Sequence, residues 1–489
     1  MKILFVASEG LPYSKTGGLA DVVGALPKAL LDAGHDVMVL LPRYKNNKVE
    51  SVAIRGLTVP SGHETLRFPN IAQGASVGGV KFFFVDDPAY FERDQLYGEK
   101  GVDYPDNGER FTEFARAAIE FVKRVWMPDV IHCHDWQSAM VPVLLRTSYA
   151  QDASVAKLPV VFTIHNLGYQ GLFPQSLLDQ AGLPASLFGM NALEYYGKVN
   201  FLKGALIYSD QLTTVSRKYA QEIQTPEYGH GLEGVIRDRA KDLTGILNGV
   251  DYAAWSPEVD KLITANYSAE NPDGKRTCKR NLLEVFKLPV QNLSRPVIGI
   301  VSRFDEQKGF DLIEAIAADL MREEASMVVL GTGKPQYEKF FTGLAQKYPS
   351  KIGVMIAYDN VVAHKIEAGA DMFLMPSRYE PCGLNQIYSL RYGTVPIVRA
   401  TGGLDDTILP YSAQNPSGTG FKFDSYDSQS LLKCVQQALA AFRDQRIWRT
   451  IQANGMARDF SWRQSAAAYA ELYARAAAKR IQGTVKTSN

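Results

Sequence analysis

Short runs of apolar residues, separated by polar loops that contain glycine, predict a series of buried strands. Near the amino terminus, residues 3–7 and 37–41 form two such runs, with a loop at residues 10–18 between them. After this loop, apolar residues recur at the three- and four-residue steps of a helix face, at Val22, Val23, Leu26, Leu30 and Leu31. Pro27 indicates either a kink or a helix start, and Gly34 ends the helix. The segment is predicted to be a βαβ unit with parallel strands and a right-handed crossover.

The same alternation continues along the chain in two series. The first series adds apolar strands at residues 81–85, 130–133, 160–164 and 211–215, with helical stretches such as 110–125 between them. The second series consists of apolar strands at residues 297–301, 327–330, 354–356, 372–375 and 395–398. Strands that alternate with helices in this way predict open, doubly wound sheets. The predicted fold class is therefore α/β, with two Rossmann-like domains in tandem.

A turn-rich stretch lies between the two series and predicts the domain boundary. It contains Asn248-Gly249-Val250-Asp251 and then Trp255-Ser256-Pro257, which could serve as a hinge. We expect one domain over residues 1–247 and a second over residues 248–460. An amphipathic, alanine-rich segment at 461–481 predicts a last helix, which can pack back on either domain; for about 461–489, packing on the first domain is the arrangement we consider.

Composition narrows the class of protein. The 489 residues include 53 Lys and Arg against 52 Asp and Glu, and this balance argues against a broad electrostatic surface for nucleic acid or membrane. Four widely spaced cysteines without a CxxC pair support neither a disulfide framework nor a thiolate zinc site. The first apolar run is too brief for a secretory signal, and no run approaches the roughly 18 apolar residues of a membrane helix. We therefore expect a cytoplasmic protein without nucleic-acid or membrane partners.

Polar and glycine-rich segments follow several of the predicted strands. They are residues 15–21, 132–137, 163–166, 302–309, 331–333 and 378–384. Doubly wound domains bind ligands at the carboxyl ends of their strands, so two facing domains should bind their ligand in the cleft between them.

Basic residues and glycines in these segments suggest a phosphate-bearing substrate. Arg303 and Lys308 lie between a strand and a helix start, where a guanidinium, an ammonium and backbone N–H groups can bind an anion; the alternative is a pair of solvated side chains. Gly402-Gly403 could open a second N–H cradle at a helix starting near Asp405, or form an ordinary turn. Lys15 beside Gly17-Gly18 could contact a ligand or be a flexible surface lysine. Because neither GxGxxG nor GxxxxGK[ST] occurs, an NAD site or a P-loop is not favoured.

Histidines at two strand ends are further candidates. His132 and His134 should share one face of a strand with Cys133 on the other, but neither HExxH nor a carboxylate triplet accompanies them. We therefore expect no metal site, and we expect His132 to be a buried imidazole bonded to backbone. His165 has a better claim to chemistry, with a turn-stabilising role as the alternative.

One carboxylate stands out near the end of the second series. Glu380 is followed by Pro381, Cys382 and Gly383 in a predicted tight turn. Cys382 could be a nucleophile, but a small residue that fills the turn is the simpler interpretation. Because no GxSxG elbow occurs, covalent acyl chemistry lacks support, and Asp405-Asp406 are expected to begin a helix.

Several of these segments together resemble one family, the bacterial glycogen synthases and plant starch synthases. The motifs that carry the resemblance cover nearly the whole chain in the family's order. They are KTGGLADV (15–22), HCHDWQ (132–137), IHNLGYQG (164–171), NGVD (248–251), SRFDEQKG (302–309), EPCGLNQ (380–386) and TGGLDDT (401–407). Two departures are Asn385, where bacterial members often have Thr, and Lys334 after the Gly-Thr-Gly turn.

The resemblance implies the two-domain GT-B fold and a retaining transfer of glucose. The implied donor is ADP-glucose, and the implied acceptor is the non-reducing 4-hydroxyl of an α-1,4-glucan, glycogen or starch. No metal or other cofactor is required. The first domain would bind the acceptor and the second the nucleotide sugar. Alternatives are another retaining GT-B enzyme that uses UDP-glucose, and a catalytically silent glucan-binding protein.

The resemblance also assigns roles to residues of this sequence. It implies catalytic roles for His165 beside the reacting carbon, for Arg303 and Lys308 on the phosphates, and for Glu380 near the donor glucose. Lys15, Gly18 and Asp21 would lie near the diphosphate and sugar. The remaining substrate-binding candidates are Asp135, Asn166, Asn248, Ser302, Gly331, Tyr358, Cys382, Gly383, Leu384 and Thr401.

Overall fold

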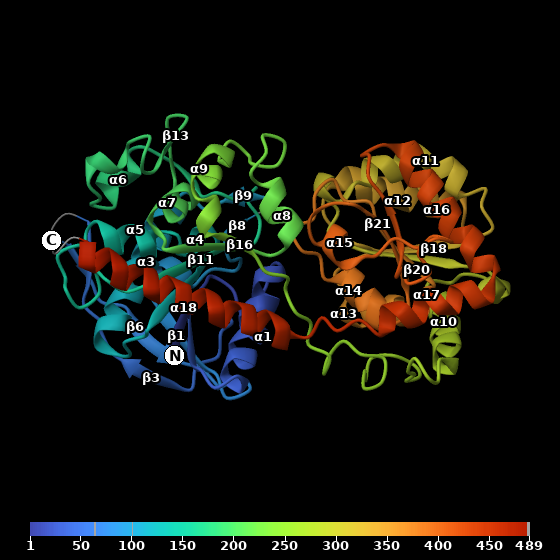
Figure 1. Ribbon diagram of the computed structural model, residues 1–489, viewed down its shortest axis with the longest axis horizontal. Helices are drawn as coiled ribbons and strands as arrows, with labels where there is room; N and C mark the ends of the chain where they lie inside the picture. Colours follow the sequence, from blue (N-terminus) through green and yellow to red (C-terminus); the bar gives the residue numbers. More distant parts are fainter. Residues whose placement is uncertain (63–64, 100, 487–489) are drawn as a thin grey trace. The chain divides into compact units, whose positions relative to one another are not determined.

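Two compact units make up the computed structural model, and each contains one large β-sheet (Figure 1). The structure describes residues 1–62, 65–99 and 101–486. The first unit comprises residues 1–215 and 220–249 together with the chain from Trp462 onward, and the second comprises residues 216–219 and 250–461.

The large sheet of the first unit is parallel except at one edge. Its strand order is β16-β15-β11-β10-β1-β2-β7-β6-β3, where β6 is antiparallel to β7 and β3 is antiparallel to β6. The strands are β1 (Lys2–Val6), β2 (Asp36–Pro42), β3 (Ser51–Ile54), β6 (Asn70–Gln73), β7 (Lys81–Asp86), β10 (Val130–His134), β11 (Val160–Ile164), β15 (Gln211–Thr214) and β16 (Leu243–Gly245). The strands that follow β1 in the chain, up to β7, lie on one side of β1 in the sheet. The later strands β10, β11, β15 and β16 lie on its other side. The order therefore reverses between β1 and β10, which makes that point the ligand-binding position of a doubly wound sheet.

Helix α1 (Gly18–Asp32) follows β1 and buries the face that its sequence periodicity predicts. Val22, Val23, Leu26 and Leu30 are fully buried, and they pack in one cluster with Phe5 of the sheet. Pro27 lies inside this helix, so the helix does not start there. The other main helices of the unit are α3 (Asn107–Arg124), α5 (Met140–Arg146), α7 (Phe201–Tyr208) and α18 (Trp462–Lys486).

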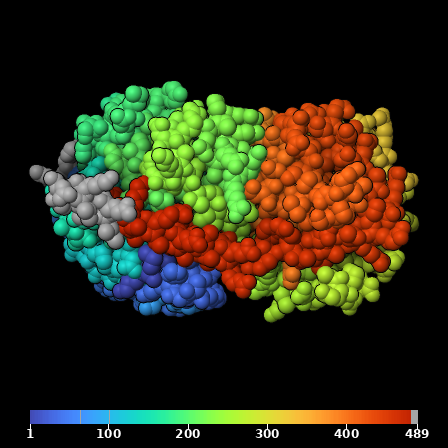
Figure 2. All heavy atoms as spheres, in the orientation of Figure 1, coloured from blue at the N-terminus to red at the C-terminus, as the bar shows by residue number. Residues whose placement is uncertain are grey.

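The C-terminal helix α18 packs on the first unit. Tyr469, Leu472 and Tyr473 are buried in the same cluster as α1 and Phe5. Figure 1 shows α18 lying across the sheet, and Figure 2 shows the red C-terminal residues between green residues on one side and blue and cyan residues on the other. The apolar face of α18 therefore covers one face of the sheet.

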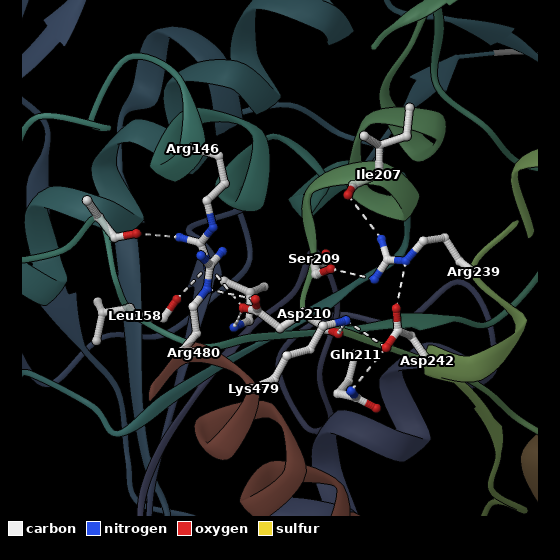
Figure 3. A network of polar contacts seen from close by, with 12 residues as sticks. Arg146, Leu158, Ile207, Ser209, Asp210, Gln211, Arg239, Asp242, Lys479 and Arg480 are labelled. Atoms are coloured by element: carbon white, nitrogen blue, oxygen red, sulfur yellow. Dashed lines mark hydrogen bonds and ion pairs between the residues drawn. The ribbon is translucent and has the colours of Figure 1, made fainter. Parts of the chain in front are cut away.

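Charged residues near the C-terminal end of α18 form ion pairs with carboxylates of the first unit (Figure 3). The Arg480 Nε atom of α18 lies 2.7 Å from Asp210 Oδ1, and Arg146 Nη2 lies 3.0 Å from Asp210 Oδ2. Lys479 Nζ lies 2.6 Å from Asp242 Oδ1. Burial raises the pKa of Asp210, whereas Arg146 lowers it. Ion pairs of Lys479 and Arg480 therefore join α18 to the rest of the unit, in addition to its buried apolar face.

The second unit contains a fully parallel sheet of order β19-β18-β17-β20-β21-β22. Its strands are β17 (Val297–Val301), β18 (Ser326–Gly331), β19 (Ile352–Ile356), β20 (Met372–Met375), β21 (Val395–Arg399) and β22 (Phe421–Phe423). The order reverses between β17 and β20, so this sheet is doubly wound as well. The predicted α/β fold class with doubly wound sheets is confirmed.

Helices cover both faces of this second sheet. They are α10 (Asp273–Val285), α11 (Phe310–Leu320), α12 (Pro335–Lys347), α13 (Asn360–Gly369), α14 (Asn385–Arg391), α15 (Gly402–Thr407), α16 (Ser428–Arg443) and α17 (Gln445–Met456). Ile298 and Ile300 of β17 pack in the cluster that contains α11 and α16, whereas Val297 packs in the cluster of α10 and α13. Successive residues of a strand point to opposite faces, which explains why β17 is apolar throughout.

Shorter elements fill the connections of the first unit and the start of the second. They are β4 (Val59–Ser61), β5 (Thr65–Arg67), α2 (Pro88–Phe91), β8 (Gly98–Glu99), β9 (Val102–Asp103), α4 (Asp135–Ser138), β12 (Leu172–Pro174), α6 (Leu177–Gln180), β13 (Glu194–Tyr195), β14 (Lys198–Asn200), α8 (Arg217–Glu222) and α9 (Glu233–Asp238). Among the described residues, none of the helices combines the length and the apolar character needed to cross a membrane.

Candidate functional site

The loop between β1 and α1 is held by the buried carboxylate of Glu9. This carboxylate accepts hydrogen bonds from the Thr16 backbone N–H at 2.5 Å, from the Thr16 hydroxyl at 2.6 Å and from the Gly17 N–H at 3.2 Å. The Tyr97 hydroxyl donates to the same carboxylate at 2.6 Å. Charge-assisted hydrogen bonds of this kind are strong, so Glu9 fixes the backbone that leads into α1.

Gly17 and Gly18 lie at the start of α1 and face open space. Gly17 has an extended backbone with φ −147°. A Cβ atom added at either glycine would meet no described atom within 4 Å. Neither a left-handed backbone nor close packing requires glycine here, and the open space leaves room for the close approach of a ligand, which stays a prediction.

Lys15 and Asp21, on either side of the glycines, form an ion pair. The distance from Lys15 Nζ to Asp21 Oδ1 is 2.7 Å, and both side chains are partly exposed. Burial raises the pKa of Asp21 even though Lys15 acts to lower it. The predicted residues Lys15, Gly18 and Asp21 therefore lie together at the carboxyl end of β1.

His165 and Asp135 lie together at the ends of β11 and β10. The Asp135 Oδ1 atom accepts a hydrogen bond from the backbone N–H of His165 at 2.7 Å, and His134 Nδ1 lies 3.0 Å from His165 Nε2. Asp135 has a φ of 55°, a strained conformation for a residue with a side chain. Burial raises the pKa of Asp135 to about 7 and lowers the pKa of His165 to about 3. At neutral pH His165 is therefore an uncharged hydrogen-bonding group.

His132 is buried, but its partners differ from those expected. Its Nε2 atom lies 2.6 Å from the Thr163 hydroxyl, and its Nδ1 atom lies 2.9 Å from the Tyr473 hydroxyl. The expectation of backbone partners was wrong, because both ring nitrogens bond side-chain hydroxyls, one from β11 and one from α18. Among the described residues, no group of three or more His, Cys, Asp or Glu side chains is placed to hold a metal ion. The expectation of a site without metal stays a prediction.

The two predicted asparagines of this unit differ in where they lie. Asn166 follows His165 at the end of β11, and its backbone N–H bonds Asp135. Asn166 Oδ1 accepts a hydrogen bond from the Gly168 N–H at 3.0 Å, so its side chain stabilises a turn. Asn248 follows β16, which β11 and β15 separate from β10 and β1. Its Oδ1 atom is enclosed without a hydrogen-bond partner among the residues described.

In the second unit, the loops after β17 and β20 are bound to each other. Gln307 Nε2 donates to the Tyr379 carbonyl at 3.1 Å, and the Arg378 N–H donates to the Gln307 carbonyl at 2.8 Å. Gly309 has a φ of +73°, and a Cβ atom there would lie 2.0 Å from the Pro376 carbonyl oxygen. Only glycine therefore permits this close contact between the two loops.

This contact places Lys308 against Glu380. Lys308 Nζ lies 2.7 Å from Glu380 Oε2, and the Ser377 hydroxyl donates to the same oxygen at 3.0 Å. Glu380 is buried, Lys308 is partly exposed, and Arg303 is exposed on the same loop as Lys308. The three predicted charged residues therefore lie on loops at the point where the strand order reverses.

The Gly402-Gly403 pair does not form an anion cradle. The N–H of Gly403 donates to the carbonyls of Glu380 and Pro381, both at 3.1 Å. A Cβ atom on Gly402 would lie 1.9 Å from the Glu380 carbonyl oxygen. The cradle interpretation was wrong, because the glycines instead let α15 pack against the loop that carries Glu380. This helix begins at Gly402, earlier than the expected start near Asp405.

The remaining candidates of the second unit are spread along the same sheet edge. Ser302 and Gly331 follow or end neighbouring strands, and a Cβ atom on Gly331 would lie 2.0 Å from the Ser302 carbonyl oxygen. Tyr358, after β19, is 80% exposed. Cys382 and Thr401 are buried, Gly383 has a φ of +69°, and Leu384 precedes α14. Burial of Cys382 fits the interpretation of a small residue that fills the turn.

Comparisons with known proteins identify the family. The family model described as "Starch synthase catalytic domain" matches residues 2–238, and the model "Glycosyl transferases group 1" matches residues 285–450. A protein named glycogen synthase from Koribacter versatilis (strain Ellin345) is 57% identical over 97% of this chain and 98% of its own length. The chain belongs to the glycogen synthase family. The resemblance seen in the sequence is confirmed, and the chain is a glycosyltransferase.

Other members and solved structures agree with this assignment. The glycogen synthase of Geotalea uraniireducens (strain Rf4) is 45% identical over 98% of this chain and 100% of its own length. The catalytic domain of starch synthase IV from Arabidopsis thaliana, bound to ADP and acarbose, matches with a TM-score of 0.89 and 34% identity, over 97% of this chain and 99% of its own. This match and the second family model confirm the GT-B fold.

Sequence reasoning missed Glu9 and Tyr97 in this glycogen synthase family member. Their side chains meet at 2.6 Å although 88 positions separate them in sequence, so no local spacing could reveal the pair. A carboxylate directly after a buried strand, at the start of the glycine-containing loop, was the available signal for Glu9.

Proposed function

We propose that this enzyme transfers glucose from ADP-glucose to the non-reducing 4-hydroxyl of an α-1,4-glucan, with retention of configuration. The second unit would bind the nucleotide sugar, and the first would bind the glucan acceptor. Glycogen synthase is the name of the relatives above, and the starch synthase IV structure is described as bound to ADP and acarbose. Both facts support a nucleotide-sugar donor and a glucan acceptor.

The single observation that carries the donor proposal is the Lys308–Glu380 pair beside Arg303. In doubly wound sheets, ligands bind outside the carboxyl ends of the strands where the strand order reverses, and these residues follow β17 and β20. A lysine already fixed by a buried carboxylate at 2.7 Å needs little reorganisation when a diphosphate binds.

The charges fit the bond changes of the reaction. The bond between the anomeric carbon of glucose and the phosphate oxygen breaks, so ADP departs with its electron pair and positive charge develops on the sugar. The acceptor 4-oxygen forms the new bond on the same face, and its proton passes to the departing phosphate. Arg303 and Lys308 stabilise the negative charge on the leaving group. Exclusion of water from the bound donor would limit hydrolysis.

His165 would bind the sugar as an uncharged hydrogen-bonding group. Burial holds its pKa near 3, so the ring is neutral at physiological pH and cannot act as an imidazolium acid. A neutral ring can still hydrogen-bond a sugar hydroxyl, which positions the anomeric carbon.

A transfer assay with radiolabelled nucleotide sugars tests the proposal. Purified protein is given glycogen and either ADP-[14C]glucose or UDP-[14C]glucose, and the label in precipitated glucan is counted. We expect incorporation from ADP-glucose at a much higher rate than from UDP-glucose. The reverse order would favour the UDP-glucose alternative, and glucan binding without incorporation from either donor would favour a silent binding protein.

We also propose a cytoplasmic location. The four cysteines are widely spaced and buried, which suits a reducing compartment better than a disulfide framework would. Fractionation of the native source, followed by detection of the protein, would test this location.

A further inference from the structure

Three histidine rings lie one after another at the ends of β10 and β11. The ring centroids of His132 and His134 are 4.0 Å apart, and those of His134 and His165 are 5.3 Å apart. The His134 ring also stacks on Phe5 of β1, with centroids 5.2 Å apart and planes inclined by 20°. His134 is therefore held between Phe5, on the strand that precedes the glycine-containing loop, and the ring of His165.

Burial keeps these rings neutral, since it lowers the pKa of all three histidines. In a neutral imidazole, one ring nitrogen carries a proton and can donate a hydrogen bond, and the other has a lone pair and can accept one. The contact of 3.0 Å between His134 Nδ1 and His165 Nε2 therefore needs a proton on one of the two atoms and a lone pair on the other. Two arrangements satisfy it, and they differ in where His165 carries its proton.

The second nitrogen of His134 decides between the arrangements. His134 Nε2 is enclosed and has no hydrogen-bond partner among the described residues. If His134 accepted at Nδ1, its proton would lie on Nε2, as a buried N–H without an acceptor. If His134 donates from Nδ1, Nε2 keeps only an unused lone pair. Orphaned buried N–H groups are rarer than under-used acceptors, so the second arrangement is favoured.

We propose that His134 is a positioning residue that holds His165 as the tautomer with its proton on Nδ1. His134 Nδ1–H donates to His165 Nε2, which leaves Nδ1 as the only N–H of the His165 ring. Any hydrogen bond from this ring to substrate must then be donated from Nδ1, toward a sugar oxygen. The hydrogen bond made by one ring nitrogen commonly sets the state of the other in this way. This inference rests on the proposed function, because it assigns a task to His165 in that reaction.

His132 offers a matched control on the same strand. It is as buried as His134, but its two nitrogens bond Thr163 and Tyr473 rather than His165. A substitution of His132 should therefore disturb packing and polar contacts in the same region without removing the donor to His165.

The first test reads the tautomer directly and needs no activity. Full-length protein labelled with 15N-histidine is examined by two-bond 1H–15N NMR, and the His165 signals are assigned by their loss in His165→Gln. We expect the Nδ1–H pattern for His165 in the wild type and in His132→Phe. In His134→Phe we expect the Nε2–H pattern or a mixture. An Nε2–H pattern for His165 in the wild type would overturn the proposal, even if neither His134→Phe nor His132→Phe folds.

The second test separates positioning from stability by kinetics. With ADP-glucose and glycogen, His134→Phe should lower kcat about 10- to 100-fold and change KM about twofold or less. His134→Asn should recover most of the lost kcat, since its amide N–H can replace the Nδ1 donor. His132→Phe should keep most of the wild-type kcat once folding has been checked by circular dichroism. Equal losses in folded His134→Asn and His134→Phe would contradict the proposal.

The two tests also separate this inference from the proposed function. If the wild type transfers no glucose from either donor but His165 shows the Nδ1–H pattern, the proposed function fails while the tautomer assignment stands. If transfer is normal but His165 has the Nε2–H pattern, the proposed function stands and this inference fails.

Discussion

The two doubly wound sheets carry different sets of groups at equivalent positions. At the β1–β10 reversal of the first unit, the ends of β10 and β11 carry neutral histidines and a carboxyl group whose pKa is raised to about 7, beside the partly exposed Lys15–Asp21 ion pair. At the β17–β20 reversal of the second unit, Lys308 and Glu380 form an ion pair, and Arg303 lies on the same loop. The backbone framework is the same, but the electrostatics differ.

Each set of groups suits a different kind of ligand group. A sugar has hydroxyl groups and no charge, so preorganised neutral hydrogen bonds suit it. A diphosphate is an anion that gains charge as the bond breaks, so fixed cations suit it. We therefore expect the diphosphate to bind at the second position and the neutral histidines of the first to bind sugar hydroxyls, and the following changes test that division.

The largest effect is expected from removing a cation of the second unit. Lys308→Ala and Arg303→Ala should each lower kcat by two or more orders of magnitude, because loss of one preorganised charge contact costs about 3 kcal/mol in the transition state. Binding of glycogen should be largely unchanged. Steady-state kinetics and a glycogen sedimentation assay give the two readouts.

Lys339→Ala is the matched control for this loss of charge. Lys339 is an exposed lysine on α12 of the same unit and belongs to neither loop of the site. Its removal should leave kcat within about twofold of the wild type, as surface substitutions usually have small effects. Near-normal turnover in both Lys308→Ala and Arg303→Ala would refute the phosphate role.

A smaller effect is expected from releasing the loop of the first unit. Glu9→Ala removes the acceptor of the Thr16 and Gly17 N–H groups and of the Tyr97 hydroxyl, which costs about 1–3 kcal/mol where these donors are left unpaired. We expect the KM for ADP-glucose to rise about tenfold, because Gly17 and Gly18 no longer hold their positions.

One further variant shows whether loss of the carboxylate or loss of the Tyr97 hydrogen bond is responsible. Tyr97→Phe removes one donor but keeps the ring, so it should raise the KM much less than Glu9→Ala does. A Glu9→Ala protein with a normal KM would show that this loop does not contact the donor.

The smallest expected effect is a pH dependence of stability that arises in the first unit. His132, His134 and His165 have lowered pKa values in the folded state, so below about pH 6.5 the unfolded chain binds protons that the folded chain does not. Stability therefore falls as the pH falls below about 6.5. Asp135 acts in the opposite sense between about pH 4 and pH 7, because its raised pKa makes the folded state bind the extra proton.

Removal of one histidine should flatten this dependence. His165→Gln should reduce the slope of unfolding free energy between pH 5 and pH 6.5 by up to about 1.4 kcal/mol per pH unit. Thermal melts at several pH values compare the variant with the wild type. Identical slopes would mean that His165 is not held neutral by burial.

The sequence predicted most of the strands because parallel strands buried on both faces are apolar throughout. Runs such as Val297–Val301 and Val160–Ile164 needed no tertiary information. The antiparallel strands β3 and β6 were not predicted. Ser51–Ile54 is mostly exposed, so it lacks the continuous apolar run that marked the others.

The candidate site was predictable only as far as local spacing reached. Strand ends and glycine pairs marked Lys15, His165 and Lys308, but not the partners that fix them. His132 meets Tyr473 across 341 positions, and Lys308 meets Glu380 across 72. The prediction of an anion cradle at Gly402-Gly403 failed for the same reason. The carbonyls that accept the Gly403 N–H belong to a loop about 20 residues earlier in the chain.

A crystal structure of the enzyme soaked with ADP would show where the diphosphate binds. We expect the diphosphate at the carboxyl ends of β17 and β20, within hydrogen-bonding distance of Arg303 and Lys308. A nucleotide bound elsewhere on the second unit, or on the first, with both side chains left as they are in its absence, would contradict this expectation.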